Sequence, residues 1–253
     1  MVERKRVVVV TGASSGIGAA TARRIAAPGL SLLLHARQNR AGLERVAAEV
    51  RQAGAAAELC LGDLGDPSVP QAIIATARAA FGRVDGIVSN AGQAQRVAVA
   101  ELAPEDLADA FAAMPVAFLR LAQAALPDLR ASPSGRVVAV SSFVAHRFGV
   151  AGMCFPATAA AKAALEALAK SLAVELAPAG VTVNCVVPGF TRKDAAGHAA
   201  TTAGAMEDAA AAIPAGRIGE PDDAASAIAY LLSEGAAHVT GAVLHVDGGL
   251  MLR

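Results

Sequence analysis

Three glycines near the start of the chain have the spacing of a phosphate-binding turn. Gly12, Gly16 and Gly18 follow four consecutive valines at 7–10, so a buried strand runs directly into a helix that starts near Ser15. Glycines let the backbone turn tightly and approach a ligand, and the N–H groups and dipole at the start of a helix favour a phosphate. The stretch predicts a dinucleotide-binding turn, with a plain packing turn as the alternative. The other residues expected to contact the ligand here are Ser14, Ser15 and Ile17.

The rest of the chain supplies the elements that would hold this turn in place. Strand-like apolar runs alternate with helical segments along the whole sequence. We expect strands at 7–10, 30–35, 56–61, 84–89, 136–140, 181–186 and 242–246. We expect helices at 19–27, 43–52, 68–81, 104–130, 158–176 and 222–232. This alternation predicts an α/β fold: a Rossmann-type, doubly wound, seven-stranded parallel sheet with helices on both faces, in a single domain over residues 1–253.

The composition excludes several classes of function. The 22 basic residues balance 22 acidic ones, and the chain has no Trp and only one Tyr, so it offers neither charge nor stacking surface for nucleic acid. No uncharged run reaches the roughly 18 residues of a membrane helix, and we expect no signal peptide before the first strand. Cys60, Cys154 and Cys185 lack the spacing of a disulfide framework or a metal site. We expect a cytoplasmic protein that acts on small molecules.

Several motifs occur in one order along the chain. They are Thr11-Gly-Ala-Ser-Ser-Gly-Ile-Gly18, Asn90-Ala-Gly92, Ser141-Ser142 at a strand end, Lys162, Asn184, Pro188-Gly189, and Thr240-Gly with Val246-Asp-Gly-Gly249. Together, over residues 6–250, they resemble the single-domain type of the short-chain dehydrogenase/reductase family. The resemblance implies a doubly wound sheet, a nicotinamide dinucleotide bound across the carboxyl ends of the strands, and usually a tetramer.

The residues that the resemblance assigns to the cofactor are present. In such folds an acid at the end of the second strand binds the ribose 2′-hydroxyl of NAD and repels a 2′-phosphate. Here that position is Ala36, and the next residue is Arg37, whose guanidinium can hold a phosphate. We therefore expect NADP(H) to be preferred, with NAD(H) possible. The resemblance assigns further cofactor contacts to Asp63 and Leu64 near the adenine, to Asn90, Ala91 and Gly92 beside the ribose, and to Lys162, Pro188 and Gly189.

The catalytic positions depart from the family pattern. The family uses a Ser to orient the carbonyl, a Tyr to exchange the proton, and a Lys to hold the nicotinamide ribose and lower the pKa of the Tyr. Ser142 and Lys162 occupy the serine and lysine positions, but Thr158 occupies the tyrosine position. A threonine hydroxyl is a much weaker acid than a phenol and is shorter. The only tyrosine, Tyr230, lies near the C-terminus. Thr158 is therefore not an adequate substitute.

Two neighbouring segments differ as well. The Asn of the family's long helix falls on Met114, followed by Pro115, which should kink that helix and partly compensate for the loss. The loop 143–157 is longer than is usual in the family and carries His146. A histidine titrates near neutrality, so His146 is the most plausible replacement acid; a solvated or structural histidine is the alternative. Cys154, between apolar neighbours, is expected to be a buried thiol.

Three functions fit these residues. The first is an NADP(H)-dependent carbonyl reductase or alcohol dehydrogenase whose acid is His146, a water held by Lys162 and Ser142, or a group of the substrate. The second is a non-redox enzyme that keeps the dinucleotide site, and the third is a catalytically impaired subunit that partners an active relative. Residues from about 191 to 216 should form the substrate lid. The sequence does not identify the substrate beyond a small carbonyl or alcohol.

The two longest helices carry more apolar residues than one buried face needs. Surplus apolar area on a helix often marks a subunit contact, and together with the resemblance it predicts a homotetramer. The residues are Phe111, Phe118, Leu119, Leu121, Leu165, Leu168 and Leu172.

Overall fold

The computed structural model of the protein describes residues 6–192 and 210–252. Its strands form a seven-stranded parallel sheet in the order β3-β2-β1-β4-β5-β6-β7, as predicted. The chain starts at the centre with β1, builds toward one edge through β3, and then returns to build toward the other edge. The point of reversal, between β1 and β4, is where sheets of this type bind ligands. The strands are β1 (Arg6–Val10), β2 (Leu30–Ala36), β3 (Ala56–Leu61), β4 (Gly86–Ser89), β5 (Arg136–Val140), β6 (Thr182–Pro188) and β7 (Val243–Val246).

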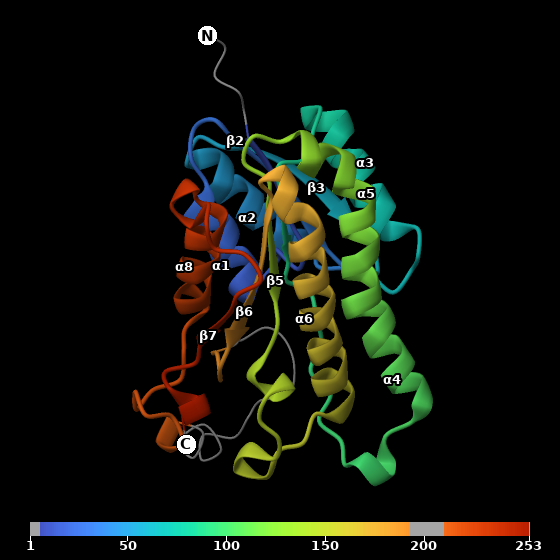
Figure 1. The fold of residues 1–253 in the computed structure, drawn as a ribbon, viewed down its shortest axis with the longest axis vertical. Helices are drawn as coiled ribbons and strands as arrows, with labels where there is room; N and C mark the ends of the chain where they lie inside the picture. Colours follow the sequence, from blue (N-terminus) through green and yellow to red (C-terminus); the bar gives the residue numbers. More distant parts are fainter. Residues whose placement is uncertain (1–5, 193–209, 253) are drawn as a thin grey trace.

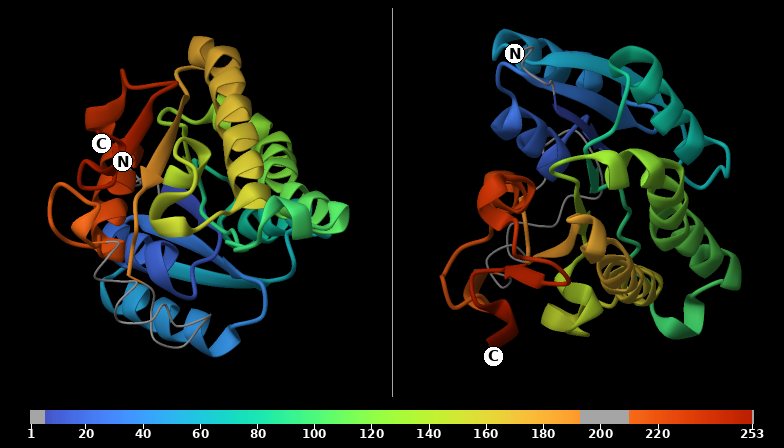
Figure 2. Two further views of the ribbon diagram at one scale, coloured as in Figure 1. Left: turned by 90° about the horizontal axis from the view of Figure 1, so that it is seen from below. Right: turned by 45° about the horizontal axis from the view of Figure 1, so that its top comes forward.

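Helices cover both faces of this sheet (Figure 1, Figure 2). One face carries α1 (Gly16–Ile25), α2 (Arg40–Gln52) and α8 (Pro221–Leu232). The other carries α3 (Val69–Phe81), α5 (Ala117–Ala131) and α6 (Pro156–Leu176), with α4 (Pro104–Phe111) leading into α5. The predicted strands and helices are confirmed; they differ at their ends, and the helix predicted over 104–130 is divided.

The valines of β1 show why the sheet is buried on both sides. Successive side chains of a strand point to opposite faces, so Val8 and Val10 pack under α1, α2 and α8, whereas Val9 packs under α3, α5 and α6. All of them are buried. A continuous apolar run, without polar alternation, is what such a two-sided position requires.

The long helix predicted over 104–130 is interrupted near its proline. α4 ends at Phe111, a π-helical turn covers Ala112–Val116, and α5 continues from Ala117. Pro115 has no backbone N–H to donate to the carbonyl four residues earlier, and the wider turn accommodates the missing hydrogen bond. The predicted kink therefore takes the form of a π-helical turn, which buries Met114.

The combined helix Pro104–Ala131 is long and apolar enough, by length and composition alone, to span a membrane. Its inner side chains, among them Phe118 and Leu121, pack in the core on the side of α3 and α6. Packing against the sheet therefore accounts for its apolar character. The same observation corrects the list of surplus apolar residues: Phe118, Leu121 and Leu165 are core residues, whereas Leu119 is exposed.

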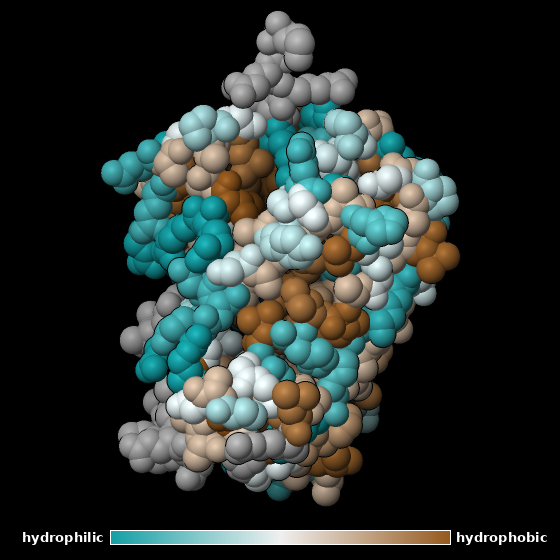
Figure 3. Space-filling view, turned by 60° about the vertical axis from the view of Figure 1, so that its left-hand side comes forward, coloured by the Kyte–Doolittle hydropathy of each residue, from teal (hydrophilic) through white to brown (hydrophobic). Residues whose placement is uncertain are grey.

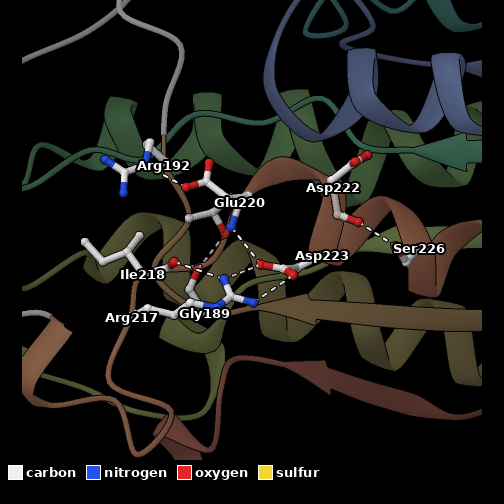
Figure 4. Close-up of polar contacts among 9 residues, drawn as sticks. Gly189, Arg192, Arg217, Ile218, Glu220, Asp222, Asp223 and Ser226 are labelled. Atoms are coloured by element: carbon white, nitrogen blue, oxygen red, sulfur yellow. Dashed lines mark hydrogen bonds and ion pairs between the residues drawn. The ribbon is translucent and has the colours of Figure 1, made fainter.

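Residues that directly follow β6 contact the residues just before α8 (Figure 4). Thr191 forms a β-bridge with Gly219, and Arg192 Nε donates to Glu220 Oε1 at 2.8 Å. These contacts join the residues that follow β6 to the residues that precede α8. Of the expected lid at 191–216, residues 193–209 lie outside the described part of the chain.

The start of α8 is held by a second pair of side chains in the same close-up (Figure 4). Arg217 donates to both carboxylate oxygens of Asp223, at 2.7 and 2.9 Å. Asp223 Oδ2 also accepts from the backbone N–H of Glu220 at 2.8 Å, which caps the helix. The hydrogen bonds from Arg217 and from this N–H lower the pKa of Asp223.

Candidate cofactor and catalytic site

The glycine turn lies at the carboxyl end of β1, at the point where the strand order reverses. Gly12 and Gly16 have φ values of +66° and +54°, a left-handed conformation that glycine adopts without strain. A Cβ on Gly18 would lie 2.3 Å from the carbonyl oxygen of Gly12 and 2.6 Å from Asn90 Nδ2. The turn can close in this form only with glycine at 18. Ser15 is the N-cap of α1, so the positive end of the helix dipole points at the turn.

The loop after β4 is fastened to this turn across the reversal point. Thr11 Oγ1 accepts from the backbone N–H groups of Asn90 and Ala91 at 3.0 and 3.1 Å. In return, Asn90 Nδ2 donates to the carbonyls of Thr11 and Gly12, at 2.9 and 3.3 Å. The structure thus brings together the two motifs that were expected to hold the cofactor, and it assigns the Asn90 side chain to bracing the turn.

The end of β2 presents a positive group and no carboxylate. Ala36 is buried, and the Arg37 side chain beyond it is 47% exposed. Arg37 Nη1 lies 3.9 Å from Asp63 Oδ2. With its amide oxygen facing the guanidinium, Gln93 accepts from Arg37 Nη1 at 2.5 Å and from Nη2 at 3.2 Å. Gln93 was not anticipated, although its place directly after Asn-Ala-Gly was a signal. Leu64, beside Asp63, is buried.

The end of β6 contributes the remaining expected cofactor positions. Pro188 is the last residue of the strand, and the N–H of Gly189 donates to the carbonyl of Val246 at 3.1 Å. A Cβ on Gly189 would lie 2.8 Å from the Cα of Asp247. Position 189 therefore requires glycine, because the backbone of Asp247 passes too close to leave room for a side chain. These residues lie at the same carboxyl edge of the sheet as the glycine turn.

Two serines at the end of β5 point in different directions. Ser142 caps a short 3₁₀ turn, where its Oγ accepts from the N–H of Val144 at 3.4 Å. Ser141 turns toward α6 and donates to Glu166 Oε1. The alternation follows from the strand geometry. Ser142 is therefore the half-buried serine available at this edge, and Ser141 is a structural partner of α6.

Lys162 is buried beside the end of β5. Its Nζ donates to the carbonyl of Val140 at 2.7 Å. A Cβ on Gly92 would lie 3.1 Å from Lys162 Nζ and 3.3 Å from Met114 Sδ, so the lack of a side chain at Gly92 makes room for both. Burial lowers the pKa of Lys162 to about 8, against the opposing influence of nearby groups that include Glu166. The ammonium is thus poised to titrate close to neutral pH.

Thr158 lies one helical turn before Lys162 on α6, in the position predicted, and it is buried. Its Oγ1 donates to the carbonyl of Gln93 at 3.3 Å and accepts from the N–H of Gln95 at 3.3 Å. The hydroxyl therefore anchors the loop after β4. Tyr230 lies on α8, across the sheet from α6.

His146 contacts α6 and β7. Its Nε2 lies 2.8 Å from Glu166 Oε1, and its ring packs edge-on to His245 with the centroids 4.9 Å apart. Within the described residues, the polar contact of His146 is with Glu166, and no hydrogen bond joins it to Ser142 or Thr158. Glu166 was not predicted as a site residue, although it lies four residues after Lys162 on the same predicted helix.

An apolar cavity of about 120 Å³ lies beside the end of β5. Phe143 and Val144, which directly follow Ser142, form one wall, and Phe155 and Ala159 flank Thr158 on another. Cys154 also lines it and is exposed, so the expectation of a buried thiol there is wrong. The extended loop 143–157 folds into two short 3₁₀ turns, which leaves Cys154 at the surface.

Comparisons with known proteins agree with this geometry. A family model described as enoyl-(acyl carrier protein) reductase matches residues 12–251. The 3-oxoacyl-(acyl-carrier-protein) reductase FabG of Escherichia coli is 34% identical over 252 residues, which cover 98% of each chain.

Two solved structures have the same fold over nearly the whole chain. A short-chain dehydrogenase from Burkholderia cenocepacia in complex with NADP has a TM-score of 0.89 and 30% identity, with 98% of each chain covered. The L-sorbose reductase from Gluconobacter frateurii, complexed with NADPH and L-sorbose, has a TM-score of 0.88 and 29% identity, covering 98% of this chain and 97% of its own.

Proposed function

Because the chain belongs to the short-chain dehydrogenase/reductase family, we propose that it is an NADP(H)-dependent oxidoreductase of the carbonyl reductase or alcohol dehydrogenase type, with a proton donor other than tyrosine. The observation that carries the proposal is the buried Lys162 ammonium beside Gly92, one helical turn from Thr158 and next to the strand end that carries Ser142. A lysine is expensive to bury, and a nicotinamide ribose at this position would account for it.

The residues at the carboxyl edge fit a dinucleotide. The glycine turn ends at Ser15, the N-cap of α1, so the start of this helix would attract a pyrophosphate bound at the turn. Arg37 supports NADP(H), because its guanidinium suits a 2′-phosphate and position 36 carries no carboxylate that would repel one. The two similar structures bound to NADP and NADPH support the same choice. Asp63 and Leu64 would lie near the adenine, and Pro188 and Gly189 near the nicotinamide end.

The cofactor, when bound, supplies or accepts the hydride. The roles proposed for the chain are to hold the nicotinamide ribose with Lys162 and to orient the substrate oxygen with Ser142. Thr158 is a poor acid, and its hydroxyl already bonds to the backbone of Gln93 and Gln95. The proton donor is then His146 through Nδ1, since Nε2 faces Glu166, or a water held by Lys162 and Ser142, or the substrate itself.

The cavity beside Ser142 supports an apolar substituent on the carbonyl compound. It is lined almost entirely by apolar side chains and, at about 120 Å³, admits only a compact group. Arg147 and Cys154 are its polar exceptions. We therefore expect short aliphatic or cyclic ketones to be better substrates than sugars.

Turnover of NADPH with a panel of ketones, followed by absorbance at 340 nm, tests the proposal. The expected result is slow, saturable oxidation of NADPH, fastest with compact apolar ketones. Losing one positioned acid costs about 10² to 10⁴ in rate, so activity should be weak but measurable. NADPH fluorescence on the same samples measures binding separately from turnover. Protein that fails to bind NADPH contradicts the proposal at the cofactor site.

A second candidate is a cofactor-binding protein without redox chemistry, either a non-redox enzyme or an impaired subunit. The observation that favours it is the engaged Thr158 hydroxyl, which leaves no phenol beside Lys162. This second function is supported if the protein binds NADPH tightly but oxidises no NADPH with any ketone, whether it is assayed alone or together with an active relative.

A further inference from the structure

Glu166 is a buried carboxylate that the proposed mechanism leaves without a role. Its side chain is 6% exposed, and its Oε1 accepts from Ser141 Oγ and lies 2.8 Å from His146 Nε2. Within the described residues, no lysine or arginine lies within ion-pair distance of it. A buried charge is costly unless a nearby positive group compensates it.

Lys162 lies one turn earlier on the same face of α6, and the charge of Glu166 acts on it. Lys162 holds the carbonyl of Val140, and Glu166 holds the hydroxyl of Ser141. Val140, the last residue of β5, and Ser141, which follows it, are thus attached to α6 by two side chains one turn apart. Ser142 follows immediately, so these two attachments fix the strand end from which the proposed catalytic serine projects.

The other ionisable groups around the pair do not replace Glu166. Cys185 on β6 faces both Lys162 and Glu166, but burial raises its pKa to about 12, so it is an uncharged thiol at neutral pH. Lys170 lies further along α6 and acts on Cys185, and the ring of His245 on β7 packs edge-on to His146. Glu166 is therefore the one negative group facing Lys162 in the described structure.

We propose that Glu166 is a positioning residue of the active site: its carboxylate fixes the end of β5 through Ser141 and keeps the buried Lys162 protonated, and His146 holds the carboxylate in place. The assignment of Lys162 to the cofactor rests on the proposed function, whereas the coupling between Glu166 and Lys162 does not. Burial alone drives Lys162 toward its neutral form, and the carboxylate opposes this change.

Direct titration of Lys162 by NMR tests the coupling in the cofactor-free protein. The chain has four lysines, so labelling with ¹⁵N-lysine gives few signals. The signal of Lys162 is assigned as the one that disappears in Lys162→Arg. Wild type is expected to titrate at about 8. Glu166→Gln keeps the shape of the side chain and removes its charge, so Lys162 should titrate lower by about half a pH unit or more.

The matched control is Glu175→Gln, which removes the same charge from an exposed position on the same helix, where it pairs with Arg130 at 2.6 Å. This variant should leave the titration of Lys162 unchanged. Glu166→Asp keeps the charge and is used if the Gln variant folds poorly; its Lys162 should titrate close to the wild-type value, and a titration lower by about half a pH unit or more would contradict the proposal. Identical titration of Lys162 in wild type and Glu166→Gln overturns the proposal.

NADPH affinity measured from pH 7 to 10 connects the coupling to function. Affinity should fall as Lys162 loses its proton, and Glu166→Gln should move that fall to lower pH by the same amount as the NMR titration. If wild type binds no NADPH at any pH, the proposed function fails, while the NMR result still decides the role of Glu166. If affinity falls at the same pH in both proteins although the titrations differ, Glu166 does not act on cofactor binding.

Discussion

Cofactor preference should depend on one side chain at the end of β2. We predict that Arg37→Ala weakens NADPH binding at least tenfold, about 1.4 kcal/mol, and leaves NADH binding unchanged, because only NADPH carries the 2′-phosphate. Dissociation constants for both cofactors, measured by fluorescence, check this. Arg40→Ala is the matched control, since Arg40 is an exposed arginine on α2 that pairs with Glu44 at 3.7 Å. An equal loss of affinity for both cofactors would show that Arg37 does not bind the 2′-phosphate.

The residue at 158 should limit the rate. We predict that Thr158→Tyr raises ketone reduction by about 10² to 10⁴, because a phenol at this position would act as a positioned acid beside Lys162. The steady-state kcat with a ketone substrate is the measurement, and Thr158→Phe, which adds the ring without the hydroxyl, is the control. An equal gain from Phe would show that ring packing, rather than acidity, changed the rate.

Single residues were predictable from the sequence where a motif names them and unpredictable where the contact is long-range. The glycine turn and Lys162 occupy the expected places because local spacing fixes them. Glu166 was missed because its partners Ser141 and His146 lie 25 and 20 residues away, so only the folded chain shows the contact. The exposure of Cys154 was misjudged for a related reason, since its neighbours in sequence are apolar but the loop turns the residue outward.

The strand-turn-helix at the start of the chain should tolerate no side chain at Gly18. We predict that Gly18→Ala abolishes measurable NADPH binding, because the added Cβ would meet the carbonyl oxygen of Gly12 at 2.3 Å and push the turn open. Isothermal titration with NADPH is the measurement. Gly82→Ala is the control: it has a φ of +83° with no atom within 4 Å of the added Cβ, so it should cost about 1 kcal/mol of stability and leave binding intact. Normal binding by the Gly18 variant would argue against this turn as the pyrophosphate site.

The beginning of α8 should show a pH-dependent contribution to stability. Asp223→Ala removes both the helix cap and the contact with Arg217, and we predict a loss of about 1 kcal/mol at pH 7. The pKa of Asp223 is lowered in the folded state, so its contribution is present above the usual aspartate pKa and is lost as pH falls through the lowered value. Unfolding curves of the two proteins should therefore converge in acid.

Asp222→Ala is the control for this comparison, since Asp222 lies in the same helical turn but its side chain makes an exposed contact with Arg24 at 3.4 Å. Its loss should be smaller at neutral pH. A constant difference between wild type and Asp223→Ala down to the lowest pH would show that the charge of Asp223 contributes nothing.

At the level of elements, the sequence predicts most of the architecture. The strands could be located from their apolar runs, because the strands of a sheet covered on both faces are apolar throughout and so differ clearly from polar loops. Pro115 predicted a kink in the long helix. Whether the backbone forms a bend or a π-helical turn there depends on the packing of Met114 against Gly92 and of this segment against α6. Local sequence does not contain that information.

The whole molecule should assemble as a homotetramer. Its remaining exposed apolar side chains include Leu119 and Val174 on α5 and α6, and Tyr230 and Leu244 on α8 and β7. Figure 3 shows the side of the molecule that carries α1 and α8, where hydrophobic surface gathers near the centre of the face. Burying such residues between subunits is favourable, by about 25 cal/mol per Å² of apolar area. Light scattering should give a mass four times the 25.2 kDa of one chain.

Single substitutions should divide the tetramer along one contact at a time. Val174 is 78% exposed, and Val174→Asp should yield dimers if α5 and α6 form an interface, with Tyr230→Asp doing the same for α8 and β7. Val99→Asp is the control, since Val99 is 73% exposed and lies on the short turn Val99–Glu101, outside α5, α6, α8 and β7. A monomeric wild type at micromolar concentration would refute the assembly.

The central place of β1 in a parallel sheet also bears on how the chain folds. Parallel neighbours cannot be joined by a tight hairpin, and the hydrogen bond between Val7 and Asp85 at the junction of β1 with β4 spans 78 residues. Sheets built from such distant pairings form in milliseconds to seconds rather than microseconds. Until β4 arrives, the valines of β1 form an unpaired apolar edge, the kind of segment that associates with other chains. The valines of β1, which directly precede the glycine turn, are therefore also a principal site of aggregation while the protein is being synthesised.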